Sequence, residues 1–513
     1  MKESMLIFKP SFVQKGRGPH IDVFVYATDE KGDTFHSDIR LNAEGVCISD
    51  TEGRSKFGVN VRWNVEGYGY LFMRADNEGS FYRLPASGRI RLDLAFELAK
   101  SRVATNQRRY EYFKNQGWRP SSECDAFISL SHEYLNDARK AGSDSHQCSL
   151  YSQSSLKYGL WASELIEVEF ARYKIEHQGR RTDFLIGCDS RGFYQMNQEL
   201  FLERFEELFN YATITHYLKG DITDFEPEEG KKQFSERDKV LSELRRRHIV
   251  VEGRPLFWTH TWVTPDWLKT KKYPLILNYL EKHIREVLQH YGDEIVIWEV
   301  VNELHDWANE LELDHKQTIE LTKFACAVAR DATPRVRLLI NNCCPFAHYV
   351  QTGKWHEKNA KYPQRTPHQF VKQLIEADAD FDIIGLQMYF TQQVFADFVQ
   401  LFERYETFGK AVHLAEVGSP SIGVSQEFLD DEKEHFSTQP YEWHRHWDEE
   451  LQADWLEYAF TYAYSRPWIE AANWYDFIDP YGFLKSGGLL RSPAGEKKAA
   501  VDRLLKLKRT LGI

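Results

Sequence analysis

Apolar and polar residues alternate in short runs along the first ninety residues, with the two-residue period of strands that bury one face. The runs read HIDVFVYATDEKGDTF at residues 20–35, GVNVRWNVEGYGYLFMRAD at residues 58–76 and RIRLDLAF at residues 89–96. Turn residues such as Gly, Asp and Asn separate them. The pattern predicts a small β-sandwich over residues 1–95, whose role is either carbohydrate binding or bracing of the rest of the chain.

Between residues 96 and 178 the apolar residues recur every three or four positions, as in FELAKSRVATNQRRYEYF and SSLKYGLWASELIEVEFARYKIE. That spacing predicts amphipathic helices, and hence a helical connecting region. From residue 179 to 513, short apolar segments such as TDFLIGCD, IVIWEVVNE and AVHLAEVG alternate with helical ones. Eight such strands in order predict parallel βαβ units closed into an α/β fold, a (β/α)₈ TIM barrel.

Composition and net charge limit the partners and the cellular location to be expected. The net charge of −12 disfavours nucleic acid and an anionic membrane as partners. Seven cysteines, an odd number without a CxxC pair, indicate reduced thiols and a cytoplasmic location. The first residues, MKESMLIFKPSF, lack the pattern of a secretory signal. Removal of an upstream signal would instead make the protein secreted.

Two glutamates end apolar strands of the predicted barrel. Glu303 follows the fourth strand in IWEVVNELHDW, and Glu416 ends the seventh in KAVHLAEVGSP. Functional residues of such barrels lie at the carboxyl ends of the strands. Two carboxyl groups across the mouth are what glycoside hydrolysis needs, and a separation of ~5–5.5 Å would retain the anomeric configuration. The alternative is that one or both are exposed or ion-paired loop residues.

The barrel resembles glycoside hydrolase family 10, the retaining endo-β-1,4-xylanases. From about residue 184 to 500, segments such as FLIGCDSRGF, GRPLFWTHTWVTPDWL, WEVVNELH, DIIGLQMYF and HLAEVG follow in family order. The resemblance implies that Glu303 is the general acid/base, Glu416 the nucleophile and Asn302 the partner of the sugar 2-hydroxyl. It also implies substrate-binding roles for Gln387, Lys219, Trp258 and Trp474. The chemistry needs no metal or organic cofactor.

The chain departs from the family where sugars are bound. Three histidines of the family are replaced in this chain by Arg254, Thr259 and Tyr389. A Glu–Asn pair of the family is replaced by Thr215–His216. Arg254 offers five donors and no acceptor, so it could bind a carboxylate or structure the pocket. Tyr389 could donate a hydrogen bond to Glu416. We therefore assign His216, Arg254 and Tyr389 to substrate binding as well.

Two functional hypotheses follow from these residues. The first is a retaining hydrolase of β-1,4-linked xylan or xylo-oligosaccharides, or of a different β-linked glycan that fits the rewritten subsites. The second is a catalytically silent protein that binds carbohydrate. In both, the expected partner is a polysaccharide or oligosaccharide, and the sequence leaves the oligomeric state open. An insertion after strand seven, with Trp443 and His444, either walls the cleft or packs on the exterior.

Overall fold

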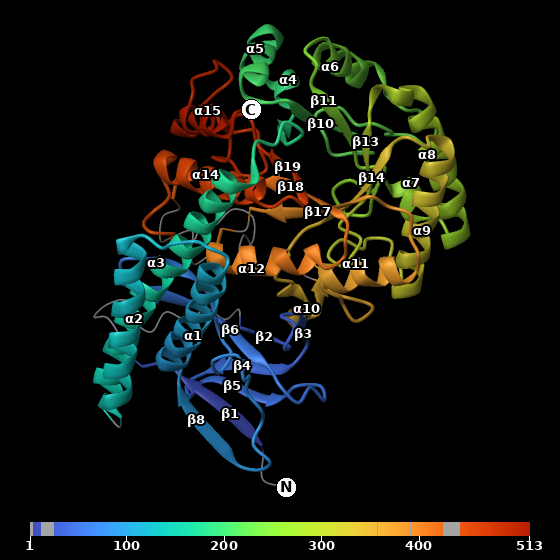
Figure 1. Cartoon of the computed structure of the whole chain (residues 1–513). Helices are drawn as coiled ribbons and strands as arrows, with labels where there is room; N and C mark the ends of the chain where they lie inside the picture. The colour runs from blue at the N-terminus through green and yellow to red at the C-terminus, as the bar shows by residue number, and fades with distance from the viewer. Residues whose placement is uncertain (1–3, 12–24, 143, 356–357, 390, 424–441) are drawn as a thin grey trace.

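The computed structural model shows two N-terminal β-sheets, a group of long helices and a barrel (Figure 1). In the orientation of Figure 1 the sheets lie below the barrel, and the helices run up one side. The first residues of the strand predicted at 20–35 lie outside the described part of the chain. The described residues are 4–11, 25–142, 144–355, 358–389, 391–423 and 442–513.

The N-terminal strands form two four-stranded sheets, as the alternating pattern predicted. Buried aromatic side chains, including those of Trp63, Tyr68 and Phe72, fill their core, so these rings serve packing. One sheet has the order β4(Asp38–Asn42), β5(Gly45–Asp50), β1(Met5–Lys9), β8(Arg89–Asp93). The other has the order β3(Thr34–Phe35), β2(Tyr26–Thr28), β6(Gly58–Val65), β7(Gly69–Ala75).

Three helices follow: α1(Leu94–Asn115), α2(Ser122–Ala141) and α3(Ser145–Gln178). Each begins after a residue whose side chain accepts a hydrogen bond from the backbone of the first turn, namely Asp93, Ser121 and Asp144. Such caps satisfy N–H groups that have no partner within the helix, which fixes where the helices start.

Eight parallel strands close into the predicted (β/α)₈ barrel. The barrel closes because β11 pairs with both β10 and β13, while the short β12 continues the third strand along β13. The strands are β9(Leu185–Asp189), β10(Tyr211–Thr215), β11(Val250–Arg254), β12(Phe257–Trp258), β13(Ile297–Asn302), β14(Arg337–Asn342), β17(Ile383–Met388), β18(Ala411–Val417) and β19(Ile469–Trp474).

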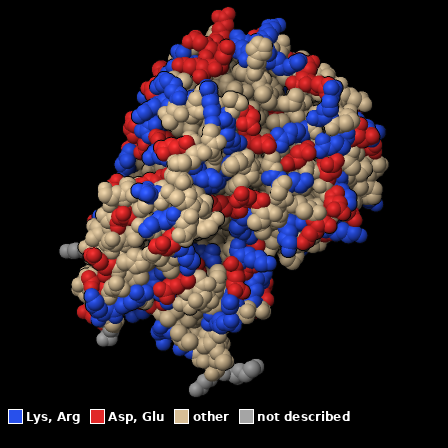
Figure 2. Space-filling model, viewed as in Figure 1, with Lys and Arg blue, Asp and Glu red and all other residues tan. Residues whose placement is uncertain are grey.

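Helices of the barrel surround these strands in Figure 1. They are α4(Gly192–Gln195), α5(Gln198–Leu208), α6(Ser235–Arg246), α7(Asp266–Lys269), α8(Tyr273–Tyr291), α9(His315–Ala332), α10(Tyr349–Thr352), α11(Pro367–Glu376), α12(Phe395–Glu406), α14(Glu449–Ser465) and α15(Ala499–Leu511). None of the described helices is long and apolar enough to cross a membrane. Acidic and basic side chains are interspersed over the face seen in Figure 2, so the negative net charge is not gathered there into one patch.

One apolar cluster seals the amino-terminal end of the barrel. It takes one residue from each of the eight strands, so this end is packed solid and the other end is left for chemistry. The members are Leu185, Tyr211, Val250, Ile297, Leu339, Ile383, Ala411 and Ala471.

Buried charges join the long helices to the barrel. Arg109 of α1 donates two hydrogen bonds of 2.6 Å to Glu167 of α3 and one of 2.6 Å to Glu403 of α12. Glu403 also pairs with Arg466, at 3.1 Å. The helical region therefore packs on both the sheets and the barrel. The predicted boundaries at residues 95 and 178 stay predictions.

Arg109→Ala should destabilise the protein by about 3–5 kcal/mol, because it leaves the buried Glu167 carboxylate without its cation. A fall in the urea midpoint of unfolding would measure this loss. Arg335→Ala is the matched control, since Arg335 pairs with Asp293 on the exposed surface and should leave the midpoint unchanged. Equal effects of the two substitutions would contradict a structural role for the buried network.

Candidate active site

The two predicted glutamates meet at the carboxyl end of the barrel. Glu303 directly follows β13, and Glu416 is the last but one residue of β18. The side-chain Nε2 of Gln387, on β17, donates to Glu303 Oε1 at 2.8 Å and to Glu416 Oε1 at 3.1 Å. Because both oxygens accept from one nitrogen, they lie within about 6 Å of each other.

Irregularities of the backbone set the direction of these side chains. The pairing register shifts between Leu386 and Gln387, on the strand pair that carries Gln387 and Glu416. A second shift lies between Glu299 and Val301 on β13. Such bulges redirect side chains and are frequent beside active sites. Glu303 itself has a φ of 53°, a left-handed conformation that costs a non-glycine residue about 1–2 kcal/mol.

Glu416 accepts hydrogen bonds from four side chains. Asn341 Nδ2 donates to its Oε1 at 2.8 Å, and Gln387 and Arg254 donate to the same oxygen. Tyr389 donates to its Oε2, which confirms the hydrogen bond predicted from the sequence. Four donors around one buried carboxyl group fix the position of both its oxygens.

Glu303 is held in its protonated state. Burial, followed by the neighbouring charge of Glu416, raises the pKa of Glu303 to about 8, against a smaller opposing effect of the Gln387 hydrogen bond. Glu303 is therefore mostly protonated at neutral pH. A proton donor beside a second carboxyl group is the arrangement that glycoside hydrolysis uses.

A third carboxyl group lies beneath the pair. Glu299 Oε2 is 3.6 Å from Arg254 Nε, and neither of its oxygens has a hydrogen-bond partner among the described residues. Burial raises the pKa of Glu299 well above its ordinary value. Arg254 thus lies between Glu416 and Glu299.

Comparison with known proteins agrees with this geometry. Residues 183–421 match the sequence model of glycosyl hydrolase family 10. Those residues form a divergent family 10 domain. Its presence makes the chain a glycosidase, and the two sheets and the long helices lie before the matched residues.

The similarity to individual relatives is low. Endo-1,4-beta-xylanase B of Thermotoga neapolitana is 25% identical over 303 residues, which cover 56% of this chain and 77% of the relative. Endo-1,4-beta-xylanase 1 of Arabidopsis thaliana is 21% identical over 64% of this chain and 30% of its own length. The crystal structure of xylanase 10B from Thermotoga maritima superposes with a TM-score of 0.50 at 19% identity, covering 67% of this chain and 98% of that one. That superposition supports the fold.

Three predicted substrate-binding residues of the family 10 domain lie on neighbouring strands or loops. Asn302 pairs in register with Trp258 of β12. Within the described part of the chain, Asn302 Oδ1 and Trp258 Nε1 are both buried without a hydrogen-bond partner. Lys219 is half-buried in the loop after β10, where the adjacent Gly220 contacts the backbone of Trp262.

The side chains of His216 and Trp474 are both buried, and their hydrogen bonds go to groups other than the two carboxylates. His216 is buried with its Nε2 3.1 Å from the hydroxyl of Tyr291 on α8, and its ring packs edge-on against Tyr291. Its geometry favours packing between the barrel wall and α8. Trp474 is fully buried, and its Nε1 donates to the carbonyl of Gly487 at 3.0 Å. Its ring therefore offers no exposed face for a sugar to stack on.

Sequence reasoning missed Asn341, Glu299 and Trp262. Asn341 lies at the end of the fifth barrel strand, so the strand-end rule that found Glu303 also applies to it. Trp262 has 60% of its surface exposed and stacks near His260, which in turn lies 4.9 Å from the ring of Trp258. This row of rings runs outward from the site toward solvent.

The described end of the insertion after strand seven packs on the helices. Trp443 is fully buried against Trp455 of α14, and its Nε1 donates to Glu164 of α3 at 2.5 Å. His444 Nε2 lies 2.6 Å from the same carboxylate. These two side chains therefore serve packing, while residues 424–441 of the insertion lie outside the described part.

Glu416→Gln should lower the pKa of Glu303 from about 8, because the charge of Glu416 is one cause of its rise. Infrared difference titration of the carboxyl stretch, with Glu303→Gln to assign the band, would measure the change. Glu312→Gln, which alters an exposed carboxylate, serves as the control. An unaltered Glu303 titration in Glu416→Gln would refute the coupling of the two groups.

Proposed function

We propose that the chain is a retaining β-glycoside hydrolase acting on β-1,4-linked xylan or xylo-oligosaccharides. The observation that carries the proposal is the single amide nitrogen of Gln387 shared by Glu303 and Glu416. It keeps the two oxygens within about 6 Å, below the ~6.5–9.5 Å that an inverting enzyme needs to admit water between its carboxyl groups.

In the first step Glu416 attacks the anomeric carbon while Glu303 gives its proton to the departing glycosidic oxygen. The bond from sugar carbon to leaving oxygen breaks, and an ester bond to Glu416 forms. In the second step Glu303 takes a proton from water, which attacks the same carbon and releases Glu416. Two inversions restore the β configuration.

The electrostatics support both roles of Glu303. Part of its raised pKa comes from the charge of Glu416, and the ester of the intermediate no longer carries that charge. The pKa of Glu303 then falls, so the group that acted as an acid is ready to act as a base. One residue thus serves both steps.

Unpartnered polar atoms support the sugar-binding roles of Asn302 and Trp258. A buried acceptor on Asn302 and a buried donor on Trp258, without partners among the described residues, suit the hydroxyl groups of a sugar. The exposed ring of Trp262 offers a stacking surface farther out. The xylan assignment draws on the names of the relatives, which are endo-1,4-beta-xylanases.

A different β-linked glycan is the second candidate. It is favoured by Arg254, which stands where the family has a histidine and binds Glu416, and by the packing role of His216. Chromatography of the products from xylo-, gluco- and manno-oligosaccharides would decide between the two sugars. Cleavage of the xylose series alone would support xylan as the substrate. Cleavage of another series alone would identify that glycan as the substrate instead.

Glu416→Ala should abolish turnover because it removes the nucleophile, and it should also lower stability because it leaves the buried Arg254 without its partner. Glu303→Ala should slow substrates with poor leaving groups by about 10²–10⁴-fold, the usual contribution of a general acid, and activated aryl glycosides far less. Steady-state kinetics on both substrate types would measure this difference. Equal losses on both substrates would exclude the acid/base role of Glu303.

The value of kcat/KM should fall as pH rises through about 8, because the first step needs a protonated Glu303 in the free enzyme. A pH–rate profile on an unactivated oligosaccharide would show the descending limb. In Glu303→Ala, assayed on an aryl glycoside, that limb should disappear. Its persistence would assign the titration to another group.

A further inference from the structure

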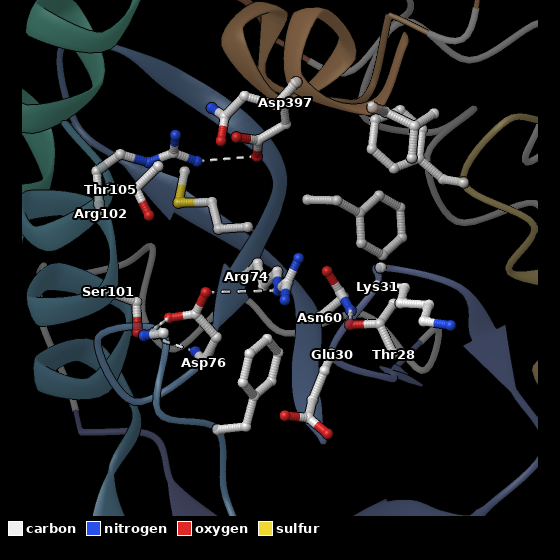
Figure 3. A pocket seen from close by; sticks show the side chains of 18 of the residues that line it. Thr28, Glu30, Lys31, Asn60, Arg74, Asp76, Ser101, Arg102, Thr105 and Asp397 are labelled. Atoms are coloured by element: carbon white, nitrogen blue, oxygen red, sulfur yellow. Dashed lines mark hydrogen bonds and ion pairs between the residues drawn. The ribbon is translucent and has the colours of Figure 1, made fainter. Parts of the chain in front are cut away.

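A cavity lies at the junction of the N-terminal sheets, helix α1 and the barrel helix α12. Its volume is about 550 Å³, which is within the range of small-molecule binding sites. Figure 3 shows Arg74 near the middle of its lining, with Arg102 and Asp397 on one side and Lys31 on the other. None of the residues of the proposed active site lines it.

The acidic residues of the cavity are already neutralised. Glu30 pairs with Lys56 at 2.7 Å, and Glu78 pairs with Arg139 at 3.1 Å; both cations lie outside the lining. Asp397 is bound by Arg102 of the lining at 2.8 Å, and Asp76 of the lining pairs with Arg74 at 3.7 Å. The lining holds five cationic side chains against four acidic ones, two of which pair with cations outside it, so the cavity keeps a surplus of positive charge in a chain of net charge −12. The five are those of Lys31, Arg74, Arg102, Arg108 and Arg404.

Two guanidinium groups converge on Gly32. A Cβ at Gly32 would lie 3.4 Å from Arg404 Nη1 and 3.8 Å from Arg74 Nη1. Asp33 holds Arg404 through Nη2, at 2.9 Å, which leaves Nη1 directed elsewhere. Asp76 pairs with Arg74 through Nε at 3.7 Å (Figure 3), which leaves Arg74 Nη1 beside Gly32. Like charges brought together in this way favour an anion between them.

Buried donors without partners mark the same place. Within the described residues, Arg74 Nε and Arg102 Nη1 are both sealed from solvent and donate no hydrogen bond. An unmet buried donor costs about 1–3 kcal/mol, more for a charged group, so the protein alone does not fully satisfy these two guanidinium groups, whose side chains line the cavity. Planar guanidinium groups match the two oxygens of a carboxylate.

The remaining lining suits the body of a sugar. The rings of Phe81 and Phe346 provide apolar faces, and Thr28 and Asn60 provide hydroxyl and amide groups. Arg74 also lies over Phe81, with its guanidinium carbon 5.2 Å from the ring centre. A carboxylate against the arginines and a sugar ring against the aromatic faces would use all of these features.

We propose that this junction cavity binds a sugar that carries a carboxylate, such as a uronic acid residue of the glycan. The choice of a sugar rests on the proposed function, while the need for an anion rests on the arginines alone. The site lies on the N-terminal region and α12, so it would hold a charged part of the substrate away from the point of cleavage.

Isothermal titration with methyl β-D-glucuronide, methyl β-D-glucoside and inorganic phosphate tests the proposal. The glucuronide should bind saturably and at least tenfold more tightly than the glucoside, since they differ in the carboxylate. Equal affinity for both glycosides, or no saturable binding of the glucuronide, would overturn it. Binding of phosphate without the glucuronide would show an anion site that takes no sugar, which also overturns it.

Arg74→Gln should weaken glucuronide binding at least tenfold, and Lys31→Met, in an exposed loop, should weaken it severalfold even if Arg74→Gln fails to fold. Lys56→Met is the matched control and should bind as the unaltered protein does. Hydrolysis of uncharged xylo-oligosaccharides should change less than twofold in Lys31→Met. Glucuronide binding without any hydrolysis would refute the proposed function alone. Unchanged glucuronide binding in both Arg74→Gln and Lys31→Met would refute the cavity as the binding site.

Discussion

The active site depends on the buried ion pair between Arg254 and Glu416. Arg254 is the cation that faces four buried carboxyl groups, those of Glu252, Glu299, Glu303 and Glu416. One positive charge offsets one negative charge, and a second bare carboxylate in this setting would cost several kcal/mol. Burial therefore raises the pKa values of Glu252, Glu299 and Glu303, while the Arg254 cation pairs with Glu416. The proposed double displacement requires a proton donor beside a nucleophile, and the crowding of buried carboxyl groups around one cation supplies the proton donor.

The backbone makes the division possible by keeping the two groups close. A regular parallel strand would direct each side chain by simple alternation, whereas the shifts at Leu386/Gln387 and Glu299/Val301 change which residues face the mouth. Glu303 adds a left-handed φ of 53°. Its N–H is held by the carbonyl of Asn341 at 2.9 Å, so the rest of the barrel enforces this conformation. The strain is local to the residue that the proposed mechanism uses as acid and base.

The sequence predicted the barrel and its two glutamates because both depend on local rules. Apolar strands alternating with amphipathic helices specify the fold, and the last residues of those strands reach the mouth. His216 shows where this reasoning fails. It follows Thr215, whose hydroxyl donates to Asp189, and alternation turns the next side chain outward toward α8. Glu299 could not be assigned either, because its role depends on distances across the barrel that no single strand reveals.

The junction between the N-terminal region and the barrel consists of buried side chains, as the interior of a domain does. Glu164 of α3 accepts from Tyr68 of the sheets and also from Trp443 beyond strand seven, all of them buried. The domain boundaries predicted from the sequence pattern place the residues of this cluster in different domains. They also separate Arg109 from Glu403, which form an ion pair. A barrel separated there would expose an unpaired glutamate and a large aromatic ring, which is costly on both counts. The sheets and long helices are therefore part of the barrel's own packing, and whatever binds at their junction bears directly on α12.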